Sequence, residues 1–380
     1  MTTSDPSHHA RHWTLASGVA HLNHGSFGAT PTRVQHARRE WLERIESSPE
    51  RFFRDELHDR LAAVRTTVAG FLGVDDASLA LVGNVTDAVA IVLRTIPFSP
   101  DSNIVISKDG YEWVTLAVTH RAREASAEVR TVELPRPGPD FEAEVLWRYI
   151  DAIDDDTALV VIDQVTSPTV LRLPVASLAE QLRGRVPVLV DGAHGPGVIP
   201  DPVTPDADFW VGSLHKWAYA PRGTSVLVAQ DRWRERVAPL VASDGTTGPY
   251  PANFDYTGTR DHSAFLAIPA ALEFPATAFD RTWPAFAAMN VEALRAGVDL
   301  VQQRLGATPC GPIDLPMTTL ELPIDADAER AGAIGAALRS HGVEVAALSR
   351  SGRLHVRLSA QPYVTPGDFA RFCDELDRLT

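Results

Sequence analysis

The sequence predicts an α/β protein in which a large part, built on a mostly parallel sheet covered by helices, precedes a smaller α+β part. Three observations carry this prediction. Between residues 103 and 229, short apolar runs alternate with helical segments. The runs are continuously apolar apart from residues at their ends, as expected for parallel strands buried on both faces. After Arg260, helical segments lead into a group of strands, and 380 residues suffice for about two domains.

The strands of the large part are predicted from runs such as NIVIS and ALVVI. They cover residues 103–107, 158–162, 187–190, 208–211 and 224–229. Helices are expected around 111–125, 141–153 and 175–183, and residues 33–72 carry Arg, Glu and Leu at helical spacing. Gly223 precedes the last of these strands so closely that a local reversal of the chain is expected there.

The second part begins with helical stretches near 262–277 and 284–306, which we expect to form an interdomain helix over about 262–306. Strands are predicted at 318–322, 343–346 and 354–359, followed by a terminal helix from about residue 366. The expected organisation is an N-terminal segment over 1–30 that contributes to the functional site, a large domain over 31–265 and a small C-terminal domain over 266–380.

Composition and charge exclude several classes of partner. The chain has 35 Lys and Arg against 49 Asp and Glu, a net charge of −14. Nucleic acids and anionic membrane surfaces select a basic face, so neither is expected to bind. No stretch approaches the roughly 20 apolar residues that cross a bilayer. The two cysteines, Cys310 and Cys373, lack the spacing of a disulfide framework or a zinc site. We therefore expect no metal and a cytoplasmic location.

Two polar groups follow successive predicted strands, at the edge where α/β sheets bind ligands. Asp191 follows PVLV on a glycine-flanked turn, and Lys216 follows DFWV within GSLHKW. Alone, an aspartate at a strand end is commonly a helix cap, and a lysine is commonly a solvated surface charge. Together, 25 residues apart on successive strand ends, they match the demand of pyridoxal phosphate chemistry.

In that chemistry a lysine amine forms a Schiff base with the cofactor, and a carboxylate keeps the ring nitrogen protonated. The ring then accepts the electron pair released when a bond at the substrate's Cα breaks. The amine must be partly desolvated, since a hydrated ammonium is no nucleophile. Leu214 and Trp217 flank Lys216 and are suited to this task.

The runs DGAHGPG, SLHKW and PRGTSVLV resemble the class V aminotransferase family of fold-type I pyridoxal-phosphate enzymes. LNHGSFGATP and TGTRDHSAFLAIPAALEF are similar to its isopenicillin N epimerase-like branch, and the resemblance runs from about residue 22 to the end. It implies the fold-type I transferase fold, pyridoxal 5'-phosphate (PLP) as cofactor, Lys216 as the Schiff-base lysine and Asp191 as the partner of the pyridine nitrogen. By the same resemblance His194 hydrogen-bonds the ring's phenolic oxygen, and Ala193 is small enough for the ring to pack on it.

A phosphate site is predicted where the apolar run LALV meets the helical run AVAIVL, because a helix N-terminus attracts anions. The resemblance implies that the amides at Asn84 and Val85 and the Thr86 hydroxyl bind the phosphate, together with Ser213 and His215. The alternative is that Asn84 or Thr86 is only a helix N-cap, although one residue can be both.

Thr259, in the run TGTR, resembles the residue that reaches the phosphate of a neighbouring subunit. This implies a homodimer with shared active sites. The alternative is an ordinary polar turn before the next helix.

Three further groups are assigned to the ring and the substrate. By the resemblance, Tyr111 covers the ring's open face, where its hydroxyl can donate a proton opposite Lys216, while Trp113 either shares the site or belongs to the core. Arg357, on a predicted strand, matches the arginine that binds the substrate carboxylate. Asn23 and His24 either border the amino-acid-like substrate or form a structural turn.

The possible reactions share removal of the Cα proton by Lys216. Reprotonation from the opposite face gives an epimerase, expulsion of a β-leaving group gives a lyase, and protonation of the cofactor gives an aminotransferase. A cysteine desulfurase needs a nucleophilic cysteine shortly before the carboxylate-binding arginine, where this chain has SRSGR at 349–353. Cys373 lies in the apolar pattern of the last helix and is expected in the core.

We predict a lyase that cleaves the C–S bond of an S-substituted cysteine, because β-elimination needs only Lys216 as a base. The alternatives are an amino-acid epimerase, whose second acid would be Tyr111, and an aminotransferase. A regulator that binds PLP without turnover is disfavoured, because Lys216, Asp191 and His194 are all intact.

Overall fold

A computed structural model describes residues 9–380, so part of the predicted N-terminal segment, residues 1–8, lies outside the described residues. The chain divides into two compact units. The large unit comprises Val34–Ser167 and Arg172–Glu273, and the small unit comprises, among the described residues, 9–33, Pro168–Leu171 and Phe274–Thr380. Within the small unit, the Thr319 hydroxyl donates a hydrogen bond to the Pro168 carbonyl at 2.9 Å, which holds the short inserted segment. The limits at residues 30 and 265, as boundaries of independently folding domains, stay predictions.

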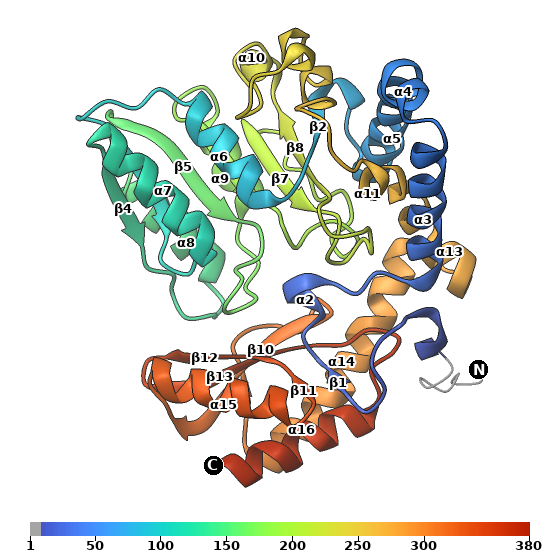
Figure 1. The fold of residues 1–380 in the computed structure, drawn as a ribbon. Coiled ribbons are helices and arrows are strands. Elements are labelled where there is room, and N and C mark those ends of the chain that lie inside the picture. The colour runs from blue at the N-terminus through green and yellow to red at the C-terminus, as the bar shows by residue number, and fades with distance from the viewer. Residues whose placement is uncertain (1–8) are drawn as a thin grey trace. The chain divides into compact units, whose positions relative to one another are not determined.

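A seven-stranded sheet forms the centre of the large unit (Figure 1), in the order β2-β8-β7-β6-β5-β3-β4. Its strands are β2 (Leu79–Val82), β3 (Asn103–Ser107), β4 (Glu128–Val132), β5 (Thr157–Asp163), β6 (Val188–Asp191), β7 (Phe209–Ser213) and β8 (Ser225–Ala229). All neighbours pair in parallel except β8, which is antiparallel to both β2 and β7. The predicted α/β fold, its mostly parallel sheet and the reversal after Gly223 are therefore confirmed.

Helices cover this sheet, and their apolar faces build the core. Helix α6 packs against α7, β7 and β8, and its residues Val89 and Val92 are fully buried. The helices of the large unit are α3 (Thr32–Ser47), α4 (Pro49–Arg51), the π-helical turn η2 (Phe52–Glu56), α5 (Leu57–Leu72), α6 (Val85–Thr95), α7 (Glu112–Ala125), α8 (Phe141–Asp151), α9 (Val175–Leu182), α10 (Asp231–Arg234), α11 (Ser263–Leu266) and α12 (Ile268–Leu272), with short 3₁₀ turns η3 (Asp76–Ser78), η4 (Asp244–Thr247) and η5 (Ala252–Phe254).

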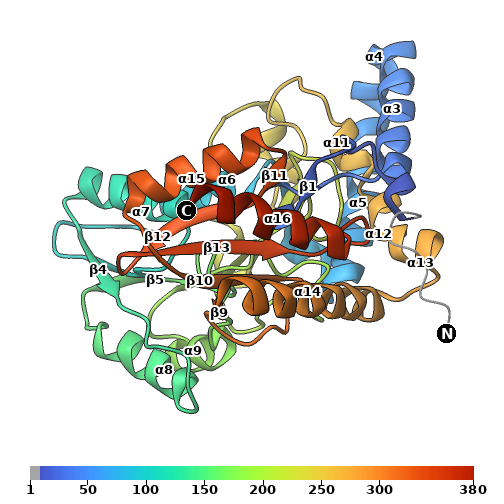
Figure 2. The same cartoon turned by 90° about the horizontal axis from the view of Figure 1, so that it is seen from below.

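The small unit contains a four-stranded antiparallel sheet in the order β12-β13-β10-β9, and a parallel pair, β1 with β11. Its strands are β1 (Ala20–His21), β9 (Thr308–Pro309), β10 (Met317–Asp325), β11 (Val343–Glu344), β12 (Ala346–Arg350) and β13 (Arg353–Ser359). Its helices are η1 (Ala10–His12), α2 (His24–Phe27), α13 (Phe274–Phe279), α14 (Trp283–Leu305), α15 (Ala328–Ser340) and α16 (Pro366–Leu379). Figure 2 shows α14, α15 and α16 beside one another along this sheet. Cys373 on α16 is fully buried, as predicted.

The expected interdomain helix over 262–306 is wrong as a single element, because the structure divides it into α11, α12, α13 and α14. Proline explains the breaks, since its ring removes a backbone donor and favours the first turn of a new helix. Pro269 and Pro284 both stand in the first turn of such a helix, and the Thr282 hydroxyl caps α14. The edge strand β4 was not predicted, because its pattern mixes charged and apolar residues.

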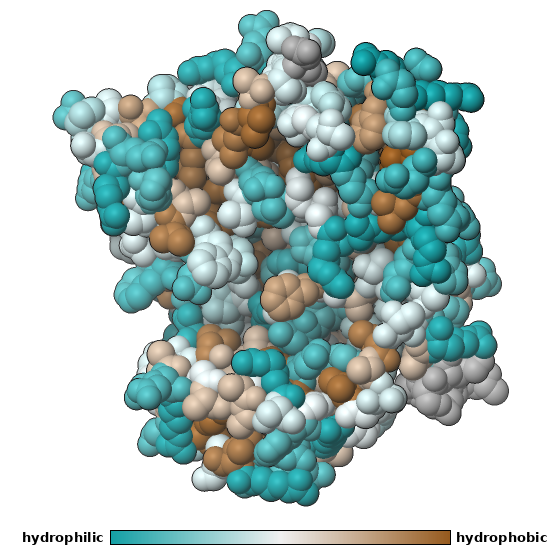
Figure 3. Space-filling model, viewed as in Figure 1, coloured by the Kyte–Doolittle hydropathy of each residue, from teal (hydrophilic) through white to brown (hydrophobic). Residues whose placement is uncertain are grey.

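Apolar side chains also appear on the surface of the large unit. Trp113 and Leu116 on α7 are about half exposed, at 51% and 56%, and line a groove of about 970 Å³ between α6 and α7. Figure 3 shows apolar patches among hydrophilic residues in this region. Within residues 9–380, no helix combines the length and the apolar character needed to span a membrane.

Candidate functional site

Most of the predicted site residues gather at one edge of the large sheet. The strands β5, β6 and β7 run in parallel, so Asp163, Asp191 and Ser213, their last residues, share this edge. Strand β2 is antiparallel to β8, which is antiparallel to β7, so the chain also leaves β2 at this edge. Ligands bind at such carboxyl ends of strands, because loops and helix N-termini meet there.

Asp191 is buried at the end of β6, with 4% of its surface exposed. Its Oδ1 accepts a hydrogen bond from the Ala193 N–H at 2.9 Å, and no other hydrogen bond to this carboxyl occurs within residues 9–380. Burial raises the pKa of Asp191, while the Ala193 N–H and the charge of Lys216 oppose this change. A buried carboxyl of this kind is suited to a cationic partner.

Two glycines flank these strand ends for a steric reason. A Cβ atom at Gly192 or at Gly212 would overlap the indole of Trp210, which lies beneath both positions. The indole therefore fills the space next to Asp191 and Ser213, and the sequence needs glycine on both strands to admit it.

Lys216 lies in the turn after β7, and its amine contacts two predicted site residues. Lys216 Nζ is 3.3 Å from His194 Nε2 and 5.8 Å from the centre of the Tyr111 ring. The other ring nitrogen of His194, Nδ1, accepts a hydrogen bond from Trp217 Nε1 at 3.1 Å. The structure thus brings Asp191, His194, Lys216 and Tyr111 together, as their assignment to one site requires.

Asp163 is a buried residue at this edge that the sequence analysis missed. Its Oδ1 accepts a hydrogen bond from the Tyr111 backbone N–H at 3.3 Å, and it pairs in register with Asp191 on β6. Burial and the neighbouring Asp191 raise the pKa of Asp163 well above its usual range. The signal was available, because Asp163 directly follows the apolar run ALVVI, just as Asp191 follows PVLV.

The predicted phosphate residues lie at the start of α6. Asn84 is the N-cap of this helix, with its Oδ1 accepting the Asp87 N–H at 2.8 Å and its Nδ2 donating to Asp87 Oδ2 at 2.9 Å. The side chain of Asn84 is thus engaged in capping. Val85 is buried and Thr86 is exposed on the first turn, where the helix N-terminus and its free N–H groups favour an anion.

Ser213 and His215 lie on either side of Leu214 at the end of β7. Ser213 is 2% exposed. His215 Nδ1 is 3.3 Å from the Thr224 carbonyl oxygen, to which it donates as the protonated ring nitrogen. Burial, aided by the charge of Lys216, lowers the pKa of His215 to about 4, so this imidazole is neutral at neutral pH.

Thr259 stands apart from these residues within the large unit. Its hydroxyl lies 2.8 Å from the hydroxyl of Tyr256. The neighbouring Arg260 lines a small cavity together with Gly83 and Asp87, which places this loop beside the start of α6.

In the small unit, Arg357, Asn23 and His24 form a second group. Arg357 Nη2 donates to Ser26 Oγ at 2.7 Å and is 3.4 Å from Asn23 Oδ1. His24 is buried: its backbone N–H donates to Ser359 Oγ at 2.8 Å, and its Nδ1 is 2.8 Å from the Tyr363 hydroxyl. Ser26, which the sequence analysis did not single out, is the residue that joins the N-terminal motif to Arg357.

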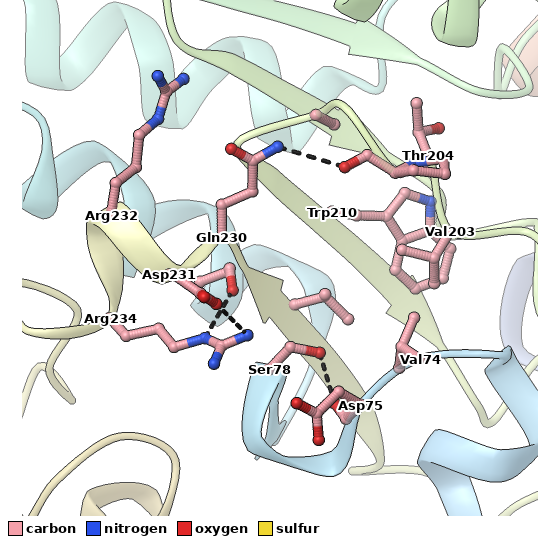
Figure 4. Close-up of a pocket in the computed structure, with 14 residues that line it drawn as sticks. Val74, Asp75, Ser78, Val203, Thr204, Trp210, Gln230, Asp231, Arg232 and Arg234 are labelled. Atoms are coloured by element: carbon pink, nitrogen blue, oxygen red, sulfur yellow. Dashed lines mark hydrogen bonds and ion pairs between the residues drawn. The ribbon is translucent and has the colours of Figure 1, made fainter.

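A separate cavity of about 520 Å³ lies at the opposite ends of the strands of the large sheet. Figure 4 shows its lining, where Arg234 pairs with Asp231 at 2.7 Å, and Trp210 reaches it from β7. It contains none of the predicted site residues. Among residues 9–380, no group of three or more His, Cys, Asp or Glu side chains is arranged to hold a metal ion.

The donor set at the strand ends fits PLP. The Lys216 amine suits the aldehyde of the cofactor, the buried Asp191 carboxyl suits the ring nitrogen, and the His194 imidazole suits the phenolic oxygen. The small Ala193 suits the ring face, and the N-terminus of α6 suits the phosphate.

Comparison with known proteins bears on this site. A family model described as aminotransferase class-V matches residues 28–274. An L-cysteine desulfhydrase of Arabidopsis thaliana is 30% identical over 294 residues, which are 72% of this chain and 64% of that protein. The chain therefore spans just under two thirds of that relative's length. An isopenicillin N epimerase of Streptomyces clavuligerus is 31% identical over 387 residues, or 95% of each chain. A solved cysteine desulfurase of Escherichia coli superposes with a TM-score of 0.80 at 19% identity, covering 100% of this chain and 99% of that one, a likeness of fold.

Proposed function

Because the chain belongs to the class-V aminotransferase family, whose members are pyridoxal-phosphate-dependent enzymes, we propose that it cleaves the C–S bond of an S-substituted cysteine by β-elimination. The observation that carries this proposal is the contact between the Lys216 amine and His194 at the strand ends, beside the buried Asp191. The Arabidopsis thaliana relative named as an L-cysteine desulfhydrase supports the same class of reaction, as does a second one named as a probable L-cysteine desulfhydrase.

In this proposal, Lys216 would hold the cofactor through its aldehyde, Asp191 would bind the ring nitrogen, and His194 would donate to the phenolic oxygen. The start of α6, with Asn84, Val85 and Thr86, binds the phosphate together with Ser213 and His215. When bound, PLP withdraws the electron pair of a bond that breaks at the substrate's Cα.

The remaining chemistry belongs to the side chains. Arg357 binds the substrate carboxylate, with Ser26 and Asn23 orienting its guanidinium. Lys216 Nζ takes the proton from Cα, the Cβ–S bond breaks, and its electron pair leaves with the sulfur, which Lys216 can protonate. Addition of water then gives pyruvate and ammonia beside the thiol. The Tyr111 ring, whose centre is 5.8 Å from the amine, would shield one side of it from water.

The test is incubation of the PLP-loaded protein with S-methyl cysteine, S-ethyl cysteine and cysteine, with assays for pyruvate, ammonia and thiol or sulfide. We expect the three products in equal amounts. If none forms from any of these substrates at high enzyme concentration, the lyase proposal is wrong.

Epimerisation is the second candidate, because the isopenicillin N epimerase of Streptomyces clavuligerus matches 95% of the chain. It requires a second acid on the face opposite Lys216, for which Tyr111 is the described residue. Exchange of the Cα hydrogen for deuterium, with loss of chirality and no pyruvate, would replace the lyase by this activity.

We also propose a homodimer with shared sites. The groove between α6 and α7 is where we place the second copy, because Thr86 lines it together with the exposed Trp113 and Leu116. A chain bound there would reach the phosphate, as the role of Thr259 demands. We expect sedimentation equilibrium to give a dimer, and Leu116→Glu to give a monomer that binds PLP more weakly. A monomeric wild type would refute this part.

The proposal includes a cytoplasmic setting. Cys310 and Cys373 are both free thiols, and a reducing compartment keeps thiols in this state.

A further inference from the structure

The side chain of Trp217, the residue after Lys216, forms a hydrogen bond with His194 in which only the indole can be the donor. Trp217 is 2% exposed, and its Nε1 lies 3.1 Å from His194 Nδ1. The two rings are tilted by 50°, with centres 6.3 Å apart, so the contact is made by the nitrogen atoms and not by stacking. An indole nitrogen carries a hydrogen and can only donate.

This direction decides where His194 carries its proton. A neutral imidazole has one N–H and one lone pair. Because Trp217 donates to Nδ1, the lone pair is on Nδ1 and the hydrogen is on Nε2. The other tautomer would bring two N–H groups together in a buried place, and leaving a buried donor unsatisfied disfavours it by roughly 10- to 100-fold.

The Nε2 hydrogen then faces Lys216, whose Nζ is 3.3 Å away. An Nε2–H can donate to this amine only while the amine has a lone pair, which means while it is uncharged. An ammonium group would set two donors against each other. The chain of contacts therefore runs from Trp217 through His194 to Lys216, and it favours the nucleophilic form of the lysine.

We propose that Trp217 is a positioning residue that holds His194 as its Nε2–H tautomer and thereby favours the uncharged amine of Lys216. This inference rests on the proposed function, because the uncharged amine matters only if Lys216 attaches the cofactor. Its physical content, the tautomer and the state of the amine, is measurable without any catalytic assay.

The first test is nuclear magnetic resonance of the full-length protein labelled with ¹⁵N and ¹³C in histidine, with and without PLP. His194→Gln identifies the resonances of His194. We expect a protonated Nε2 and a lone-pair Nδ1 in the wild type, and a mixture of tautomers in Trp217→Phe. Trp147→Phe, at a largely exposed position on α8, is the matched control and leaves His194 unchanged. An Nδ1–H tautomer in the wild type, or an unchanged one in Trp217→Phe, overturns the proposal.

The second test uses the lysine content of the chain, which is only Lys108 and Lys216. Competitive acetylation of the cofactor-free protein, read by peptide mass spectrometry, reports the reactivity of Lys216 against Lys108 as an internal standard. Lys108 is exposed on the surface, where it pairs with Glu133, and it is not part of the Trp217–His194–Lys216 contacts. We expect the ratio to fall about threefold or more in Trp217→Phe, and to stay constant in Trp147→Phe. An unchanged ratio shows that Trp217 does not act on the amine.

If Trp217→Phe fails to fold, the indole can be replaced by its benzothiophene isostere, which keeps the shape and removes only the N–H. The same tautomer and acetylation outcomes then decide. The two proposals also fail separately. Normal tautomer and reactivity without PLP binding would refute the proposed function alone, while PLP binding with an unchanged His194 tautomer in the isostere would refute the role of Trp217 alone.

Discussion

The two groups of candidate site residues differ in whether the side chains around the charged group titrate. At the strand ends of the large unit, Asp163, Asp191, Lys216 and His215 are titratable groups set close together, and three of them have shifted pKa values. In the small unit, the Arg357 guanidinium rests on the hydroxyl of Ser26 and the amide oxygen of Asn23, which do not titrate. Changes of pH and of ligand charge should therefore act on the first group, and changes of shape on the second.

Removal of the Lys216 amine should have the largest effect on the group in the large unit. We expect Lys216→Ala to lower kcat by at least about 10³-fold and to abolish the visible colour of the PLP-loaded protein. Lys108→Ala is the control, since Lys108 and Lys216 are the two lysines of the chain. Borohydride reduction followed by peptide mass spectrometry should find the cofactor on the Lys216 peptide. A cofactor found on Lys108, or equal colour in Lys216→Ala, would contradict the assignment.

The two buried carboxyls of the large unit should differ in their response to the same substitution. Asp191→Asn removes a charge that the ring nitrogen needs, and we expect kcat to fall on the order of 10²-fold. Asp163→Asn should retain activity within a few fold, because burial and the neighbouring Asp191 raise the pKa of Asp163 and so disfavour its charged form, and the amide oxygen still accepts the Tyr111 N–H. Steady-state kinetics of both variants decide. Similar losses would show that Asp163 is needed as a charge.

The same contrast explains how much of the molecule could be predicted. Asp191, His194 and Lys216 lie within 26 consecutive residues on successive strand ends, so a local pattern revealed them. The parallel strands were also predictable, because each is a short apolar run. Asp163 was equally accessible to this reasoning and was missed, because nothing in its neighbourhood matched a motif.

Contacts between distant segments were beyond this reasoning. Ser26 and Arg357 are 331 residues apart, and the hydrogen bond between them follows from how β13 and the N-terminal segment pack. The donor role of Trp217 depends on which way an indole turns, and its apolar character predicted only desolvation of Lys216. The four helices between 262 and 306 could not be separated by their helical pattern alone, because the breaks between them depend on where proline starts a new turn.

A substitution at Arg357 tests the group in the small unit, where the geometry of the guanidinium, and not its titration, should determine substrate binding. We expect Arg357→Lys to raise KM for the amino-acid substrate roughly 10- to 100-fold, because lysine keeps the charge and loses the paired donors that fit a carboxylate. Arg353→Lys, on the same strand but exposed and paired with Asp325, is the matched control. The effect should be the same at pH 6 and pH 8. A KM close to that of the wild type would remove Arg357 from the site.

His215 gives the smallest expected effect and the one most specific to the large unit. Its pKa is about 4 in the folded chain against an ordinary 6.5, so between these values the unfolded chain binds a proton that the folded chain does not. The contribution of a neutral His215 to stability is therefore complete above about pH 6.5 and is lost as the pH falls toward 4. Without cofactor, urea unfolding of the wild type between pH 7 and 4.5 should lose roughly 2 kcal/mol more than that of His215→Gln.

Binding of PLP should reduce that difference if His215 contacts the phosphate. A dianion beside the imidazole favours its protonated form, which raises the folded-state pKa toward the unfolded value and removes the proton uptake on unfolding. The wild type and His215→Gln should then lose stability in parallel as the pH falls. Arg304→Gln, at an ion pair on the surface of the small unit, serves as a control in which PLP leaves the pH dependence unchanged. A difference between wild type and His215→Gln that survives PLP binding would place His215 away from the phosphate and leave Ser213 and the start of α6 to hold it.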